Sequence, residues 1–204
     1  MSIFGPIIDA NQVEEAARNT LRDWFQTYLN EFALQRSIPL DRLPYPRSFI
    51  LTGDNEKEPE DQLPAIAIVS PGLADEPLQE GDGSFRSNWS LGVGIFISAI
   101  DRESTERVVR WYCAIIRAIM LQRQSLGGFS DGVRWLDEGY DELEFDDERT
   151  IGAGLVEFEV EVAGVVNKRM GPAYPDPPDP DEQPGSNWPI VDEVIVDEEI
   201  LEEV

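Results

Sequence analysis

A change of hydrophobic period between residues 89 and 120 constrains the fold of this chain more than any other feature. Over residues 89–97 every odd position is apolar, and this alternation predicts a strand with one buried face. From Val108 to Met120 the apolar residues recur every three or four positions, which predicts a helix with one buried stripe. We therefore expect a strand and a helix to form the core of the fold.

The ends of these two elements carry further signals. The strand is predicted over 85–98, and Gly92 and Gly94 on its second face indicate a bulge or the close approach of another backbone. Asp101 or Ser104 is expected to cap the helix, which ends near Gln122.

A first helix is predicted over about residues 10–34. Asp9 and Gln12 match a capping box, and apolar residues follow at helical spacing. The polar side of this helix is expected to face solvent or a partner; it comprises Glu14, Arg18, Arg22, Asp23 and Gln26. Two short strands are predicted over 48–52 and 64–70.

The rest of the core sequence predicts a long loop and two more strands. Residues 71–84 are rich in Gly, Pro and acids and are expected to form the loop. One strand is expected at 133–136, followed by an acidic loop or irregular edge, and a last strand at 150–166. The predicted class is α+β, with two helices packed on one side of a mostly antiparallel sheet.

The last strand has an acidic face. Val156, Phe158, Val160 and Val162 alternate with Glu157, Glu159 and Glu161. Because like charges on one strand repel, the glutamates are expected to face water, a basic patch or an open channel.

The second helix carries a quarter of the chain's 16 basic residues, namely Arg107, Arg110, Arg117 and Arg123. They are expected either to form a solvated face that balances an acidic domain or to pair with acids on a neighbouring copy.

The net charge of −25, from 41 acids and 16 bases, disfavours binding to nucleic acid or anionic lipid. No apolar run approaches the length of a membrane helix, and the N-terminus lacks the features of a signal peptide. We expect synthesis in a reducing cytosol and no membrane partner.

Catalysis and cofactor binding are not expected. The chain has no histidine, which removes imidazole bases and histidine metal ligands, and Cys113 is expected to be a buried core residue. The acidic loop 53–62 could hold a hard cation but does not match an EF-hand, so a solvated loop is preferred. The acids of 137–147 lack signs of burial or a basic partner, so no catalytic carboxylate, metal site or cofactor is predicted.

Two regions are predicted, a domain over 1–170 and an extended Pro-rich acidic arm over 171–204. The arm carries eleven acids and no base, and the domain carries 30 acids and 16 bases, a net charge of −14. The arm is expected to be a disordered tail or to add a strand or helix to its own body or to another subunit. Its apolar anchors would be Trp188, Ile190, Val194, Ile195 and Val196.

The order of elements over about 13–166 resembles the tail terminator proteins of long-tailed, non-contractile bacteriophages, which cap the tail tube at the neck. The segments that carry the resemblance are the Pro-led strand 63–69, the strand 89–97, the connection 101–106, the helix 109–121 and the final strand 155–162. It is a resemblance of element order with soft motifs, and it leaves out the arm from residue 171.

The resemblance implies a structural virion protein, assembled in the host cytoplasm. It would form a homo-hexameric ring on the head-proximal end of the tail tube, stop tube polymerisation and join the tail to the head-completion or stopper proteins. DNA would pass through the lumen without specific binding. Glu157, Glu159 and Glu161, or the acids of 137–147, would face this lumen. Arg107, Arg110 and Arg117, with the apolar residues of the arm, would contact neighbouring subunits.

Three alternatives stay open at this point. The chain could be another ring of the phage neck, such as a head-tail stopper or adaptor, or a tube protein. It could be a monomeric acidic module that mimics the charge of nucleic acid. An enzyme that works with carboxylates alone is the least favoured alternative.

Overall fold

The computed structural model describes residues 6–51, 63–98, 102–145 and 149–169 and has the α+β architecture predicted above. Its elements in chain order are α1 (Ala10–Arg36), the short 3₁₀ helix η1 (Leu40–Arg42), β1 (Ser48–Leu51), β2 (Ala65–Leu73), β3 (Leu78–Gln79), β4 (Phe85–Ser98), α2 (Arg102–Gln122), β5 (Gly132–Phe145) and β6 (Arg149–Val162). The strands form one sheet in the order β1-β2-β4-β6-β5, with β3 paired to β4. Only the β1–β2 pairing among the described strands is parallel.

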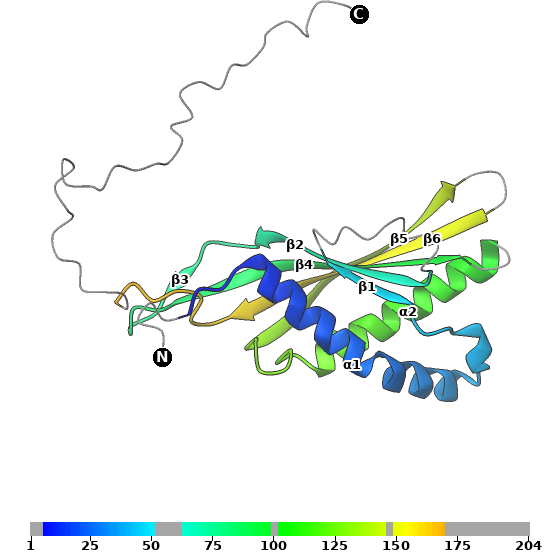
Figure 1. Ribbon diagram of the computed structural model, residues 1–204, viewed down its shortest axis with the longest axis horizontal. Helices are drawn as coiled ribbons and strands as arrows, with labels where there is room; N and C mark the ends of the chain where they lie inside the picture. The colour runs from blue at the N-terminus through cyan, green and yellow to red at the C-terminus, as the bar shows by residue number, and fades with distance from the viewer. Residues whose placement is uncertain (1–5, 52–62, 99–101, 146–148, 170–204) are drawn as a thin grey trace, which may run out of the picture. The chain divides into compact units, whose positions relative to one another are not determined.

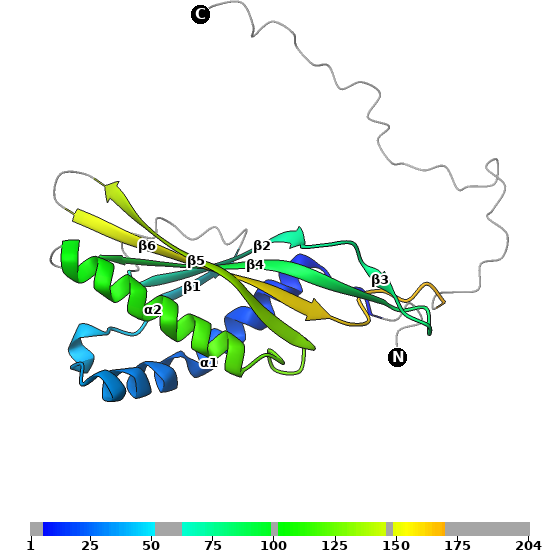
Figure 2. The same ribbon diagram turned by 180° about the vertical axis from the view of Figure 1, so that it is seen from behind.

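Both helices cover the same face of the sheet (Figures 1 and 2). Helix α1 packs against β1 and β2, and α2 packs against β4, β6 and β5. The covered face is apolar because the odd positions of β4 and the even positions of β6 point toward the helices, and these side chains are almost completely buried. The other face of the sheet carries the opposite parity and is not covered by either helix.

Helix α1 begins and ends as its sequence predicts. Asp9 accepts a hydrogen bond from the backbone N–H of Gln12, and the Gln12 side chain accepts one from the N–H of Asp9, which completes the capping box. Ser37 adopts a left-handed conformation at the C-terminus, and its N–H satisfies the carbonyl of Leu34. These contacts define both ends of the helix.

One residue of α1 differs from the prediction of a solvated polar side. Glu14 is 1% exposed, and its Oε1 accepts a hydrogen bond of 2.6 Å from the backbone N–H of Ser70. Ser70 lies at an irregularity of β2, between Val69 and Gly72, where the register with β4 shifts. The carboxylate therefore satisfies a strand N–H at a bulge, which the helical period alone does not reveal.

The predicted loop over 71–84 is wrong in part. Strand β2 continues to Leu73, and β3 pairs with the start of β4 through Leu78 and Gln79. The Ala74 N–H also donates to the Asn88 carbonyl. The bulge changes which residues face the core, so the strand continues without the alternation that would reveal it.

The prediction for 133–145 is also wrong. Instead of a short strand and an acidic loop, β5 runs through Phe145 and pairs with β6 over its whole length. A register shift between Trp135 and Asp137 interrupts the apolar alternation. Acidic residues are acceptable here because β5 lies at the edge of the sheet, where charged side chains reach water.

Two smaller predictions concern the ends of α2 and the glycines of β4. Ser104 lies within α2 and is not its cap, and Asp101 falls outside the described residues. Gly92 pairs with Val69, where the register of β2 begins to shift, so the bulge lies on the neighbouring strand. A Cβ at Gly92 would lie 3.3 Å from Val69 Cγ1 and 3.4 Å from Leu155 Cδ1, so neighbouring side chains close over this glycine.

Helix α2 approaches the sheet most closely at two glycines of β6 that the sequence reading did not single out. A Cβ at Gly152 would lie 2.6 Å from Thr105 Cγ2, and one at Gly154 would lie 2.5 Å from the Sγ of Cys113. No real Cβ tolerates such distances. These positions therefore need glycine for space rather than for backbone conformation.

We expect Gly154→Ala to lower the free energy of unfolding by about 1–3 kcal/mol, because the methyl group would force α2 away from β6. Gly94→Ala is the matched control: Gly94 lies on the central strand β4, and its nearest side-chain atom would be 3.6 Å away, an ordinary contact. Urea denaturation of both variants measures the difference. Equal stabilities would contradict the close packing of α2 on β6.

Candidate subunit-contact surfaces

The acidic stripe of β6 lies on the uncovered face of the sheet, as its alternation predicts. Val156, Phe158 and Val160 are fully buried beneath the helices. Glu157 is exposed on the opposite face, and Glu159 and Glu161 are half-buried there. The stripe is therefore available to solvent or to another molecule on one side only.

Two arginines from neighbouring strands neutralise part of this stripe. Arg134 of β5 pairs with Glu159 at 2.5 Å, directly across the strand pairing. Arg86 of β4 forms ion pairs with Glu161 and, at 2.9 Å, with Glu80. The two carboxylates raise the pKa of Arg86 above its usual value.

Glu157 is different because its cross-strand neighbour on β5 is Asp137. Of the three glutamates, it is the one that makes no ion pair with the residues that the structure describes. The uncompensated negative charge thus lies toward the middle of β6. The sequence alone does not show that Arg134 lies beside Glu159 and Arg86 beside Glu161. These neighbours become visible only once the register of the strands is known.

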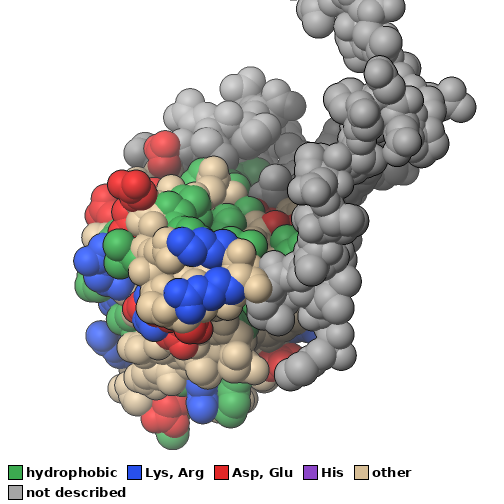
Figure 3. Space-filling model, turned by 90° about the vertical axis from the view of Figure 1, so that its left-hand side faces the viewer, with side chains coloured by type: hydrophobic (Ala, Val, Ile, Leu, Met, Phe, Trp, Pro, Cys, Tyr) green, Lys and Arg blue, Asp and Glu red, His purple; other side chains and the backbone are tan. Residues whose placement is uncertain are grey.

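A hollow of about 480 Å³ lies over the paired part of the stripe. Arg86, Arg134, Glu159 and Glu161 line it together with the acids Asp75 and Asp131. The full lining holds five acids, including Glu76, against these two arginines, which already bind carboxylates, so the hollow keeps an excess of negative charge. At the end of the domain near β3, acidic and basic side chains are interspersed (Figure 3).

The arginines of α2 have different surroundings. Arg107 is 54% exposed and pairs with Glu103 one turn earlier at 2.5 Å. The Arg110 guanidinium lies 5.2 Å from the centre of the Tyr140 ring. Arg123 lies against Trp24 of α1, 3.5 Å from the ring centre. Arg107 and Arg110 are exposed and can reach another molecule, whereas Arg123 is packed within the domain.

Arg117 is engaged by β5 of its own chain. It forms an ion pair with Glu138, whose side chain is 7% exposed, and its guanidinium lies 4.6 Å from the centre of the Trp135 ring. Tyr140 also donates a hydrogen bond to Glu138. Burial and this bond raise the pKa of Tyr140 to about 12. Helix α2 is thereby tied to the edge strand through charge as well as through apolar packing.

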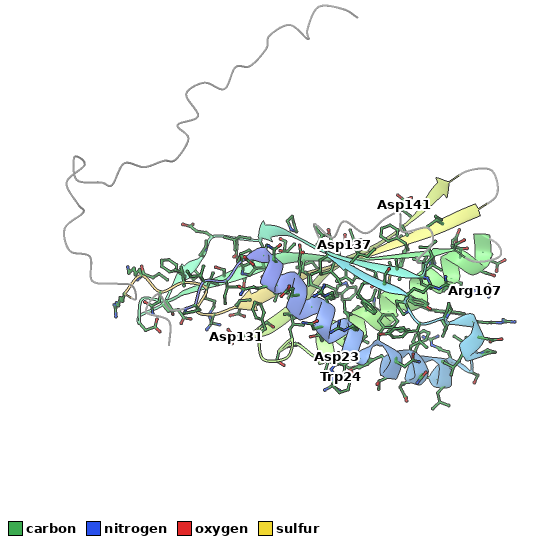
Figure 4. The ribbon with its side chains drawn as sticks, viewed as in Figure 1. Asp23, Trp24, Arg107, Asp131, Asp137 and Asp141 are labelled. Carbon is green, nitrogen blue, oxygen red and sulfur yellow. The ribbon has the colours of Figure 1, made fainter. Side chains whose placement is uncertain are left out.

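Strand β5 presents one free edge. Within the described part of the chain it pairs only with β6, and it exposes Trp135, Leu136 and Tyr140 to between 43% and 48%. Asp137 and Asp141 lie along this strand, and Arg107 lies near the start of α2 (Figure 4). Exposed apolar groups, aromatic rings and unpaired backbone groups on one edge are features of a protein contact surface.

The predicted contact residues of the arm, Trp188, Ile190, Val194, Ile195 and Val196, lie outside the described residues. The same holds for the acidic loop 53–62 and for the boundary between 170 and 171. Among the described residues, no group of three or more acidic or cysteine side chains has the arrangement of a metal site. No helix among them is long and apolar enough to cross a membrane.

The predicted acidic set 137–147 is described only in its first part. Asp137 and Asp141 are exposed, and Glu138 is held by Arg117 and Tyr140. The side chains from 142 to 147 fall outside the description. Of the described Asp137, Glu138 and Asp141, only Asp141 is among the lining residues of a pocket, which has a volume of about 290 Å³ and is also lined by Glu106 and Arg110.

No protein-family model matches this chain, and a search of curated proteins finds no match either.

We expect Arg117→Met to destabilise the domain by roughly 2 kcal/mol or more, because it leaves the buried Glu138 carboxylate without its cation. Thermal and urea denaturation measure the loss. Arg107→Met on the same helix removes an exposed pair and should change stability by less than about 0.5 kcal/mol. Adding Glu138→Gln to Arg117→Met should recover part of the lost stability. If it does not, the loss does not come from the unpaired Glu138 carboxylate.

The single thiol should be unreactive in the folded chain. Cys113 is buried, and burial raises its pKa from 9.0 to about 12. We expect a disulfide reagent at pH 8 to modify Cys113 only as fast as the chain unfolds, and completely in denaturant. Because the folded pKa is the higher one, the contribution of this group to stability is fully present below pH 9 and declines as the pH rises toward 12. Rapid modification of the native protein would contradict this burial.

Proposed function

We propose that this chain is a structural subunit of a phage tail, which forms a ring that caps the head-proximal end of the tail tube. In this role it stops polymerisation of the tube and joins the tail to the head-completion proteins. The proposal takes up the resemblance in element order over 13–166 to tail terminator proteins. The observation that carries it further is the free edge of β5, with the exposed Arg110 of α2 against Tyr140.

A ring needs two different surfaces on each subunit, because head-to-tail contacts close a rotation. The β5 edge, with Trp135, Leu136 and Tyr140, supplies one surface rich in residues typical of interfaces. Arg110, whose guanidinium lies 5.2 Å from the Tyr140 ring centre, adjoins this edge, and Arg107 is exposed on the same helix; both can pair with acids of a neighbour in an acidic assembly. Arg117 supports this surface from within through Glu138.

The uncovered face of the sheet is then the best candidate for the lumen. Its exposed Glu157 and the neighbouring Asp137 present negative charge, and Arg86 and Arg134 limit the repulsion within the stripe. A net negative lumen would repel the phosphates of passing DNA and so prevent binding. The proposed partners are the tube protein on one side and a stopper protein on the other.

Electron microscopy and sedimentation of the purified full chain test this function. We expect single rings of six copies and a sedimentation coefficient to match. Long tubes would instead indicate a tube protein, and a monomer at every concentration would indicate an acidic binding module. Either result would contradict the proposal of a capping ring.

Charge reversal tests the proposed contact surface. We expect the double substitution Arg107→Glu and Arg110→Glu to shift the sedimenting species from rings toward monomers, because it removes two cations and adds two like charges. Arg36→Glu, at the exposed end of α1, is the control for the same kind of charge change and should leave the rings intact. Rings that persist in the double variant would exclude this helix from the interface.

A further inference from the structure

A pocket of about 590 Å³, here called the α1 hollow, lies between the first half of α1 and the turn that joins α2 to β5. Part of its lining is apolar and comes from both elements, namely Ala16, Trp24, Leu126 and Phe129. Helix α1 also contributes the exposed carboxylates of Glu15 and Asp23. Figure 4 shows Asp23 and Trp24 at the side of α1 away from the strands, so the hollow opens on the outer surface of the helix layer.

The walls of the α1 hollow are fixed by the fold. The carbonyl oxygen of Ser125 accepts hydrogen bonds of 2.8 to 3.0 Å from three backbone N–H groups of the turn. Leu126 has a left-handed backbone, with φ at 44°, and its side chain is 3% exposed and so anchors the turn in the core. Arg123 packs across the hollow on Trp24, 3.5 Å from the ring centre. A hollow with fixed walls needs little ordering when another molecule enters it.

The other end of α1 carries two exposed leucines. Leu34, in the last turn, is 75% exposed, and Leu40, at the start of η1, is 52% exposed. Asp41 and Arg42 follow Leu40 and are also exposed. Figure 1 shows that this segment, residues 34–42, projects from the domain where the chain turns back from α1 toward β1. We call it the α1 corner; exposed apolar groups gathered in this way mark protein contact sites.

We propose that the α1 corner of one copy docks in the α1 hollow of a second copy. The leucines would then leave water and contact the apolar part of the lining. The charges also match, because Arg42 can face Glu15 or Asp23, and Asp41 can face Arg123. Glu15, Asp23, Asp41 and Arg42 form no ion pair with the residues that the structure describes, so they are available for this contact.

A single chain cannot make this contact with itself. Trp24 of the hollow and Leu34 of the corner are ten residues apart on one continuous helix, which separates them by about 15 Å along its axis. The corner and the hollow are different surfaces, so docking repeats head to tail from copy to copy. The inference rests on the proposed ring only in giving that ring a further subunit contact, and it applies equally to any other head-to-tail assembly.

Arg36 is outside the proposed contact. Its guanidinium lies 5.7 Å from the centre of the Phe32 ring. Arg36 and Leu34 are two residues apart on α1 and therefore lie on nearly opposite sides of the helix. A charge change at Arg36 should thus leave the docking of the corner intact.

Disulfide cross-linking of two variants of the full chain tests the contact directly. Asn19→Cys places a thiol in the lining of the hollow, and Leu40→Cys places one on the corner, while the native Cys113 is buried. We expect a mild oxidant to link the two variants into heterodimers when they are mixed, and neither variant to be linked when it is alone. Leu78→Cys, at a side chain that is 67% exposed on β3, is the control for Leu40→Cys and should not link to Asn19→Cys.

A substitution on the corner should also weaken self-association. We expect Leu40→Asp to lower the association constant measured by sedimentation at least about tenfold, because a charge replaces an apolar group that docking would bury. Leu78→Asp makes the same change at another exposed leucine and should leave the constant unchanged. Both positions are exposed, so both variants should keep the native melting temperature.

The outcomes separate this contact from the proposed capping function. Rings that persist in Leu40→Asp, without a cross-link between positions 19 and 40, would overturn the contact and leave the ring standing. Long tubes that carry the cross-link and are dispersed by Leu40→Asp would support the contact and contradict the capping role. Equal linking of Leu40→Cys to itself would indicate a symmetric contact and overturn head-to-tail docking. A monomer without any cross-link would overturn both proposals.

Discussion

Helix α2 rests on the sheet at Gly152 and Gly154, and the arrangement of the domain depends on this contact. Because these two residues have no Cβ, Thr105, Val109 and Cys113 lie against the backbone of β6. A side chain at position 152 or 154 would prevent this close approach. This depth of packing holds α2 within reach of β5, where Arg117 binds Glu138 and lies against Trp135. A helix one methyl group further from the sheet would weaken that link, and with it the shape of the β5 edge.

The predictability of each element follows from the strength of its local signal. The bounds of β4 and the end of α2 were predicted correctly because an uninterrupted apolar period identifies a buried face. The bounds of β5 were not predicted correctly, because one extra residue at its bulge breaks the apolar alternation and acids occupy an edge that water can reach. Gly152 and Gly154 gave no signal of their own, since a glycine that is needed for space looks like any other until its neighbour is known.

The candidate surfaces were less predictable than the fold, and the reason is electrostatic. The sequence shows which residues are charged but does not show which of them neutralise each other. Glu157, Glu159 and Glu161 look equivalent in the alternation, yet Arg134 and Arg86 compensate two of them and leave the third beside Asp137. Likewise a pocket of about 350 Å³ beside β1 is lined by Arg18 and Arg22 of α1 and by Arg47 and Ser48 from a segment about 25 residues later, and no periodicity relates these segments.

The distribution of paired and unpaired arginines divides the domain into two sides. At the β5 side Arg117 and Arg134 bind carboxylates of their own chain, and Arg107 pairs with Glu103 on its own helix, so Arg110 makes no ion pair with the described residues and is left for another molecule. At the β1 side Arg18, Arg22 and Arg47 keep their charge uncompensated by the described residues. Because β5 and β1 lie at opposite edges of the sheet, the width of the sheet separates these two sides.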